Sequence, residues 1–173
     1  MTEQLLKYDD LFKIPEAMMP MPVLSDNVRS VISGMIKVHS KGMYNHFMWL
    51  TRPGVLATQN VTGFKALPLK AYTKRNRLKL FWFPTWEPDT RQAIIAAIDA
   101  DLAAPWYKRR YDFLAYLGHV TGIQAIHSPW SEICSEKARY IPGFDLTNPT
   151  PQDVNAWLER SPDAQVYGRY TPD

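Results

Sequence analysis

Residues 44–60 read YNHFMWLTRPGVLATQN, and this stretch decides the fold class. Tyr44 to Thr51 is dense in aromatic and aliphatic residues and short enough to be a buried strand. The following Arg52-Pro53-Gly54 supplies a turn, because Pro sets φ at the second turn position and Gly accepts a positive φ. Val55 to Asn60 returns as a second strand, so the stretch predicts a β-hairpin.

Further elements are predicted on both sides of the hairpin. Residues 1–24 are rich in Pro and Met and are expected to form an irregular N-terminal segment along the surface. Apolar spacing and helix-start residues then indicate a helix over Asp26–Val38, a strand over Leu78–Phe83, a helix over Pro88–Ala103, a helix over Tyr111–Val120, a helix after Pro129, a helix over Pro151–Leu158 and a strand over Ala164–Tyr170. The mixture predicts one α+β domain over residues 25–173, with a central antiparallel sheet packed against helices.

The amino-acid composition excludes several kinds of binding and metal site. The chain has 173 residues, which fits one domain, and its single cysteine excludes an intrachain disulfide and any multi-thiolate metal centre. Its 8 glycines are not clustered, and no histidine has a partner at ligand spacing, so we expect neither a cofactor nor a metal. The sequence shows no signal peptide and no apolar run of the ~20 residues that a membrane helix needs, which predicts a soluble protein made in the cytoplasm.

Charge is distributed unevenly along the chain. The net charge is +3, yet the segment between Asn27 and Trp86 holds ten bases and no acid, which leaves −7 for the rest of the chain. A surface for an anionic partner is one interpretation. We favour the other, in which a basic sheet faces an acidic helical layer of the same fold, so nucleic acid is not an expected partner. The cluster Lys74-Arg75-Asn76-Arg77 is expected to form a turn tip before a strand.

His46 is the first candidate for chemistry, because it lies within an apolar strand. An imidazole in this position is either a core residue with its polar atoms paired or a functional group. If Pro53 and Gly54 occupy the centre of the turn, Arg52 pairs with Val55. Side chains alternate along a strand, so this register places Gln59 on the face of His46 and Thr58 on the other face, whereas a bulge would reverse the assignment.

Cys134 is the second candidate. Pro129 and Ser131 are helix-start residues, which places Cys134 in the first turns of a predicted helix. Unpaired amides at a helix N-terminus lower the pKa of a thiol and favour the thiolate. The alternative is a buried structural cysteine, since Ile133, Cys134, Ala138 and Ile141 form an apolar stripe.

The order of these features resembles the circularly permuted branch of the NlpC-like papain-fold cysteine hydrolases, the YiiX-like group. In that group the strand that bears the histidine precedes the cysteine. The matching pieces are Tyr44 to Leu50, Val55 to Gln59 with Gly63-Phe64, Tyr111-Asp112-Phe113, Ile133-Cys134-Ser135-Glu136 and the proline-containing segment Asn148 to Val154. The resemblance spans residues 25–160 and implies a permuted papain-like fold.

The resemblance also implies the roles of three residues. Cys134 would be the nucleophile, His46 the general base and then acid, and Gln59 the polar residue that orients the imidazole. The family often has Glu, Asp or His at the third position, and a neutral Gln stabilises an imidazolium less. Lys137 and Arg139 also replace the apolar residues that usually follow the Cys-Ser-Glu signature.

Four functions follow from this sequence. The first is a thiol hydrolase, an amidase or peptidase that cleaves peptidoglycan stem peptides or similar isopeptides. The second uses the same site as a lipid-acting acyl hydrolase or acyltransferase. The third is a non-catalytic binding or structural module of a larger particle, such as a viral one, and the fourth is an anion or nucleic-acid binder. A wall-cleaving enzyme without a signal peptide would leave the cell by lysis or aboard a viral or secretion particle.

Overall fold

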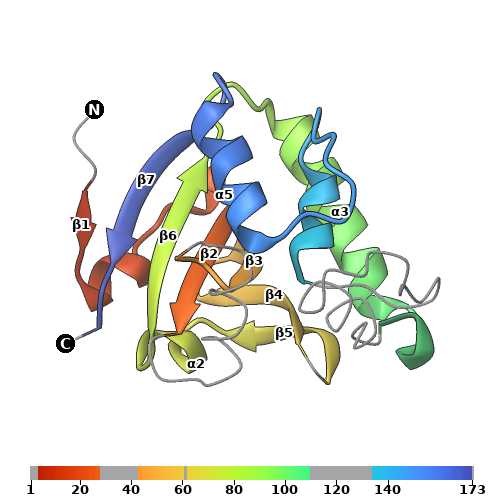
Figure 1. Cartoon of the computed structure of the whole chain (residues 1–173), viewed down its shortest axis with the longest axis horizontal. Helices are drawn as coiled ribbons and strands as arrows, with labels where there is room; N and C mark the ends of the chain where they lie inside the picture. The colour runs from red at the N-terminus through yellow and green to blue at the C-terminus, as the bar shows by residue number, and fades with distance from the viewer. Residues whose placement is uncertain (1–3, 28–42, 61, 110–133, 173) are drawn as a thin grey trace.

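The fold is built around one mixed sheet of seven strands (Figure 1). The computed structural model describes residues 4–27, 43–60, 62–109 and 134–172. The strand order is β1-β7-β6-β2-β3-β4-β5, and every neighbouring pair is antiparallel except β1 with β7. The strands are β1 (Leu5–Leu6), β2 (Met21–Asn27), β3 (His46–Arg52), β4 (Val55–Asn60), β5 (Gly63–Pro68), β6 (Asn76–Trp82) and β7 (Gln165–Tyr170).

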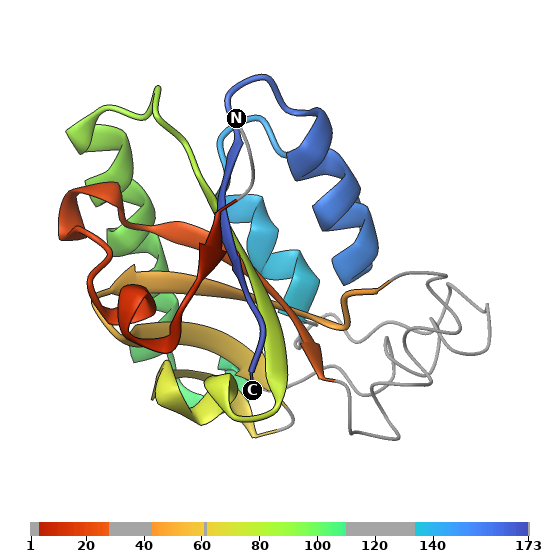
Figure 2. The same ribbon diagram turned by 90° about the vertical axis from the view of Figure 1, so that its left-hand side faces the viewer.

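Helices cover mainly one face of this sheet (Figures 1 and 2). The α-helices are α2 (Lys70–Thr73), α3 (Pro88–Ala103) and α5 (Pro151–Arg160), and the 3₁₀ helices are η1 (Tyr8–Phe12), η2 (Glu16–Met18), η3 (Trp106–Arg109) and η4 (Cys134–Tyr140). Side chains from α3, η4 and α5 enclose an aromatic core with Phe47 and Trp49 of β3. A second core on the opposite face joins Met48 and Leu50 to η1 and the segment before β2. Burial of both faces explains why β3 is apolar almost throughout.

The α+β class is confirmed, and so are several of the predicted elements. Helix α3 occupies the predicted residues, α5 extends two residues beyond its prediction, and β6 and β7 lie where strands were expected. The turn predicted over Lys74-Arg75-Asn76-Arg77 is confirmed for Lys74 and Arg75, which connect α2 to β6, but it is wrong for Asn76 and Arg77, which begin β6. The predicted helix over Asp26–Val38 is wrong at its start, because Asp26 and Asn27 end β2. Its remainder, the helix over Tyr111–Val120 and the start of the helix after Pro129 lie outside the described residues.

The expectation of an irregular segment over residues 1–24 is wrong. β2 lies in the middle of the sheet, hydrogen-bonded to β3 on one side and to β6 on the other. Met21, Val23 and Leu24 are fully buried there. Two prolines near this strand suggested a loop, because Pro cannot donate a ladder hydrogen bond. The apolar contacts that β2 makes on both faces of the sheet outweigh that local preference.

The hairpin forms as predicted, but its register contains a bulge. Arg52 pairs with Val55, and Gly54 has a φ of 71° in the turn. Between Leu50 and Arg52 the register shifts by one residue, so that Met48 pairs with Thr58. A one-residue shift exchanges the two faces of a strand relative to its partner. Thr58 therefore shares a face with His46, and Gln59 shares a face with Phe47.

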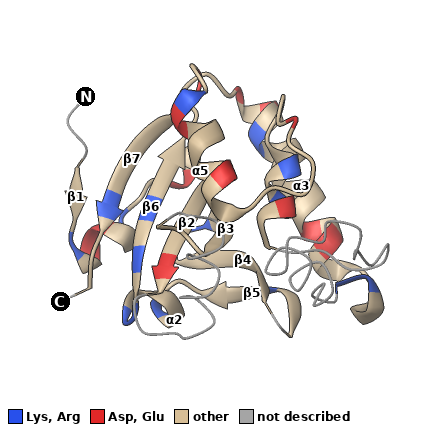
Figure 3. Cartoon of the chain, in the orientation of Figure 1, with Lys and Arg blue, Asp and Glu red and all other residues tan. Residues whose placement is uncertain are grey.

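Bases of the sheet pair with acids of the helical layer, and Figure 3 shows the bases on β6 and the acids on α3 and α5. Arg52 of β3 contacts Asp99 of α3 at 2.6 Å. Lys79 of β6 is 1% exposed and binds Glu159 of α5. These ion pairs support the intramolecular interpretation of the basic segment. No helix in the described ranges is long and apolar enough to cross a membrane.

Candidate functional site

A short hydrogen-bonded chain of side chains begins at His46. Its Nε2 lies 2.6 Å from Oγ1 of Thr58, which lies 3.2 Å from the hydroxyl of Tyr72 in α2. The Tyr72 ring also stacks on the imidazole, with 5.9 Å between centroids and 6° between planes. The bulge in the hairpin creates this cluster, because it turns Thr58 toward His46. The imidazole is therefore oriented by a hydroxyl and an aromatic ring.

Gln59 does not take the position predicted for it. Its side chain is 1% exposed, lies on the face opposite His46, and donates from Nε2 to the carbonyl oxygen of Arg109 at 3.1 Å. The prediction that Gln59 shares the face of His46 is wrong because of the bulge at Thr51. Thr58 is the residue that sequence reasoning missed. A bulge in the hairpin would have placed it on the face of His46, and the sequence alone does not locate such a bulge. No sequence signal pointed to Tyr72, which a separate helix brings to the site.

Burial sets the protonation state of His46. The pKa of its ring falls from 6.5 to about 4, because desolvation disfavours the charged imidazolium. Within the described residues the only hydrogen bond of the ring is the one from Nε2 to Thr58, and Nδ1 makes none. When Nε2–H donates to Thr58, Nδ1 carries the lone pair. At neutral pH the ring is thus uncharged and able to accept a proton at Nδ1.

This lowered pKa predicts acid sensitivity of the fold. The unfolded chain protonates His46 near pH 6.5, whereas the folded chain protonates it near pH 4. The stabilising contribution is complete above pH 6.5 and is lost as the pH falls through 4. The shift corresponds to at most about 3 kcal/mol, and water at the partly exposed ring reduces this value.

Urea unfolding at pH 7, 5.5 and 4 measures the effect. We expect His46→Gln to flatten the decline in the free energy of unfolding over this range, whereas Thr58→Val, which keeps the ring, retains most of it. An equal decline in His46→Gln and the unaltered protein would contradict the assignment.

Cys134 opens η4 and is 5% exposed. Burial raises the pKa of its thiol from 9.0 to about 11, although backbone amides of Phe47, Ser135 and Cys134 oppose the shift. The prediction of a lowered thiol pKa at a helix start is therefore wrong in direction. Desolvation outweighs these amides, and a 3₁₀ helix of seven residues has only a small macrodipole.

The thiol lies against the strand that carries His46, and the imidazole is not its contact there. Cys134 lies against the backbone of Phe47, the residue that follows His46, because η4 packs on β3 (Figure 1). Burial raises the pKa of the Tyr72 phenol, and a negative charge on Cys134 would add to that shift. Within the described ranges no hydrogen bond joins Cys134 to His46. The structure thus brings His46, Thr58 and Tyr72 together on one face of β3, whereas η4, which carries the thiol, packs on the face of Phe47 and Trp49.

The surrounding helix is fixed by charged residues that the family signature does not contain. Lys137 is buried and its Nζ lies 2.8 Å from a carboxylate oxygen of Asp101 in α3, a carboxylate that also binds Arg139. Trp49 of β3 donates from its indole nitrogen to the carbonyl oxygen of Lys137 at 2.9 Å. These contacts hold η4 between β3 and α3, and they therefore fix the position of the residue at its start, Cys134. The two bases differ in exposure, since the side chain of Arg139 is 44% exposed and that of Lys137 only 5%.

Neither a group of metal-ligating side chains among the described residues nor a similarity to known proteins identifies the site. Among the described residues, no three His, Cys, Asp or Glu side chains are grouped as metal ligands. No protein-family model matches the chain, and a search of the curated proteins finds no significant match. The residues themselves therefore carry the functional argument.

Proposed function

We propose that this chain is a thiol-dependent hydrolase of amide bonds, with Cys134 as nucleophile and His46 as base. The observation that carries the proposal is the location of the thiol against the backbone of Phe47, the residue next in sequence to an imidazole that Thr58 and Tyr72 orient. The order of histidine strand and cysteine helix, which resembles that of the permuted papain-like hydrolases, supports the same assignment. In this proposal the fold is the permuted papain-like one.

The chemistry proceeds from two neutral groups. The thiol and the imidazole are both uncharged at pH 7, since the pKa of Cys134 is about 11 and the pKa of His46 is about 4. Nδ1 of His46 removes the thiol proton as sulfur attacks the carbonyl carbon, and the imidazolium then protonates the leaving amine. Water subsequently cleaves the thioester and releases the acid. Attack requires the His46 ring, at the first residue of β3, to approach the sulfur from the face of the strand that it shares with Thr58.

Thr58 replaces Gln59 as the orienting residue in this mechanism. Here the Nε2–H of His46 donates to the Thr58 hydroxyl, which also lies within hydrogen-bond distance of the Tyr72 hydroxyl, and this contact fixes the ring tautomer. A hydroxyl supplies no negative charge, so it stabilises the imidazolium less than a carboxylate does. We therefore infer a slow hydrolase or one that acts on activated acyl groups.

Intact-mass spectrometry tests the proposal. The protein is incubated separately with a muramyl tetrapeptide, with a p-nitrophenyl acyl ester and with phosphatidylcholine, and trapped adducts are mapped by peptide sequencing. We expect an acyl adduct on Cys134 that is absent from Cys134→Ala, together with release of amine from the peptide. Transfer of the fatty acyl chain alone would favour the lipid-acting alternative.

Absence of any adduct would overturn the proposal. A thiol that is 5% exposed and mostly protonated is also what a structural cysteine requires. That observation favours a non-catalytic module of a larger particle as the second candidate. Product no higher than the protein-free background, for the unaltered protein and for Cys134→Ala alike, would favour the second candidate over the first.

A further inference from the structure

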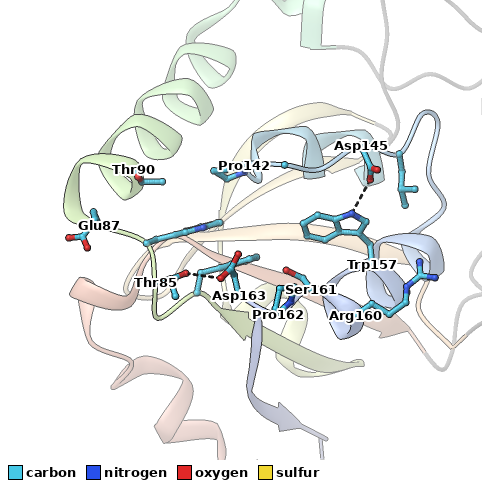
Figure 4. A pocket seen from close by; sticks show the side chains of 14 residues that line it. Thr85, Glu87, Thr90, Pro142, Asp145, Trp157, Arg160, Ser161, Pro162 and Asp163 are labelled. Carbon is cyan, nitrogen blue, oxygen red and sulfur yellow. Dashed lines mark hydrogen bonds between the residues drawn. The ribbon is translucent and has the colours of Figure 1, made fainter.

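A cavity of about 710 Å³ lies at the other end of η4 from Cys134. Three segments enclose it: the connection from β6 to α3, the turn after η4, and the end of α5 with the following residues (Figure 4). The seven residues of η4 separate it from the thiol by roughly 14 Å, at about 2 Å of rise per residue. Its volume is within the range of small-ligand sites, which is roughly 300–1,000 Å³. The cavity is therefore distinct from the proposed catalytic site.

Two tryptophans line this cavity, and both are held in place. Trp86 stacks on buried Phe83 with 3.9 Å between ring centroids and 3° between planes. Trp157 donates from its indole nitrogen to Asp145 at 3.0 Å and packs edge to face on Phe144 at 5.1 Å. Both indoles are only partly buried. Rigid, partly exposed aromatic rings bind apolar ligand surfaces at a low entropic cost.

Polar side chains around the indoles supply donors and acceptors together. Glu87, Asp145 and Asp163 contribute carboxylates, Arg160 contributes a guanidinium, and Thr85 contributes a hydroxyl. Figure 4 shows Asp145 beside Trp157, and it shows Thr85 and Asp163 on the opposite side of the cavity. Asp145 uses one oxygen for the indole, and a carboxylate accepts several hydrogen bonds. The rim can thus pair with a ligand that carries many hydroxyl groups.

We infer that this cavity binds a neutral oligosaccharide. A pyranose ring has an apolar C–H face that packs on an indole, and its hydroxyls both donate and accept hydrogen bonds. Three carboxylates line the cavity with the guanidinium of Arg160. The guanidinium of Arg91 lies 5.9 Å from the ring centre of Trp86 but already donates to three backbone carbonyl oxygens, so the lining disfavours phosphates and uronic acids. Arg160 disfavours an organic cation at the same place. The inference does not depend on the proposed hydrolase, because neither Cys134 nor His46 lines the cavity.

Isothermal titration with a defined panel tests the inference. The neutral probes are chitotetraose, cellotetraose, maltotetraose and mannotetraose, and the comparison probes are tetragalacturonate and tetramethylammonium. We expect at least one neutral oligosaccharide to bind with a Kd of roughly 10 µM to 1 mM, and tetragalacturonate not to bind. Binding should move the indole N–H signal of Trp157 in a ¹H–¹⁵N spectrum, and Trp157→Ala should weaken affinity at least tenfold.

Substitutions of two exposed carboxylates, one inside the cavity and one outside it, separate a loss of binding from a loss of folding. Asp163 lines the cavity, whereas Asp89 in the first turn of α3 does not. Asp163→Ala should weaken binding several-fold, and Asp89→Ala should leave it unchanged. Binding of tetramethylammonium in place of the sugars, no binding of any neutral oligosaccharide, or equal weakening by both substitutions would overturn the inference. Because Cys134→Ala should retain sugar binding, failure of the hydrolase proposal and failure of this one are distinguishable.

Discussion

Cys134→Ser is expected to reduce the hydrolysis of p-nitrophenyl acyl esters by at least about 1,000-fold. A serine hydroxyl is far less acidic than a thiol, and an imidazole with a pKa of about 4 is too weak a base to activate it. The loss should appear in kcat, because the nucleophile acts in the transition state rather than in substrate binding. Steady-state kinetics of the purified variant measure it, with circular dichroism as the control for folding. Retention of more than a tenth of the activity would contradict the assignment of Cys134.

A neighbouring pair of substitutions separates the two candidates for the orienting residue. Thr58→Val is nearly isosteric and removes the hydroxyl that holds Nε2 of His46, so kcat should fall at least about tenfold with little change in KM. Gln59→Leu removes the hydrogen bond to Arg109 and should lower the free energy of unfolding by about 1 kcal/mol without lowering kcat per folded molecule. The opposite pattern would restore Gln59 to the role that the sequence resemblance implied.

Alkylation of Cys134 by iodoacetamide at pH 8 is expected to be about 100-fold slower in the folded protein than in urea. Iodoacetamide reacts with the thiolate, and raising the pKa from 9.0 to about 11 lowers the thiolate fraction by about that factor. Because the folded pKa is the higher one, the rate in the folded protein should still be rising at pH 10, where the rate in urea has levelled off. Mass spectrometry of quenched time points gives both rates.

His46→Ala is the informative control for that experiment. In the free protein the imidazole makes no hydrogen bond to the thiol within the described residues, so this variant should show an unchanged alkylation profile. A folded-state midpoint below pH 8 that His46→Ala abolishes would instead reveal a thiolate–imidazolium pair, and would contradict the two neutral groups derived from burial.

Local sequence signals predicted those elements whose formation depends on nearby residues. Pro88 at the first position of α3 and Thr150 as the N-cap of α5 are helix signals that need no tertiary context. The turn at Pro53-Gly54 likewise depends on the φ preferences of two residues. β2 escaped prediction because its prolines argue against a strand, and only its contacts with β3, β6 and both cores stabilise it.

For the candidate site, the sequence by itself determined which residues are the candidates for chemistry: one thiol in 173 residues and one imidazole in an apolar strand. The tertiary structure alone decided how those groups behave. A single-residue bulge between Leu50 and Arg52 places Thr58, rather than Gln59, beside the imidazole of His46. Side chains alternate along a strand, so a shift of one residue changes the face on which each side chain lies. Burial raised the pKa of the Cys134 thiol and lowered the pKa of the His46 ring. Desolvation depends on every segment packed around a group rather than on its neighbours in the chain, so the sequence could not give these shifts.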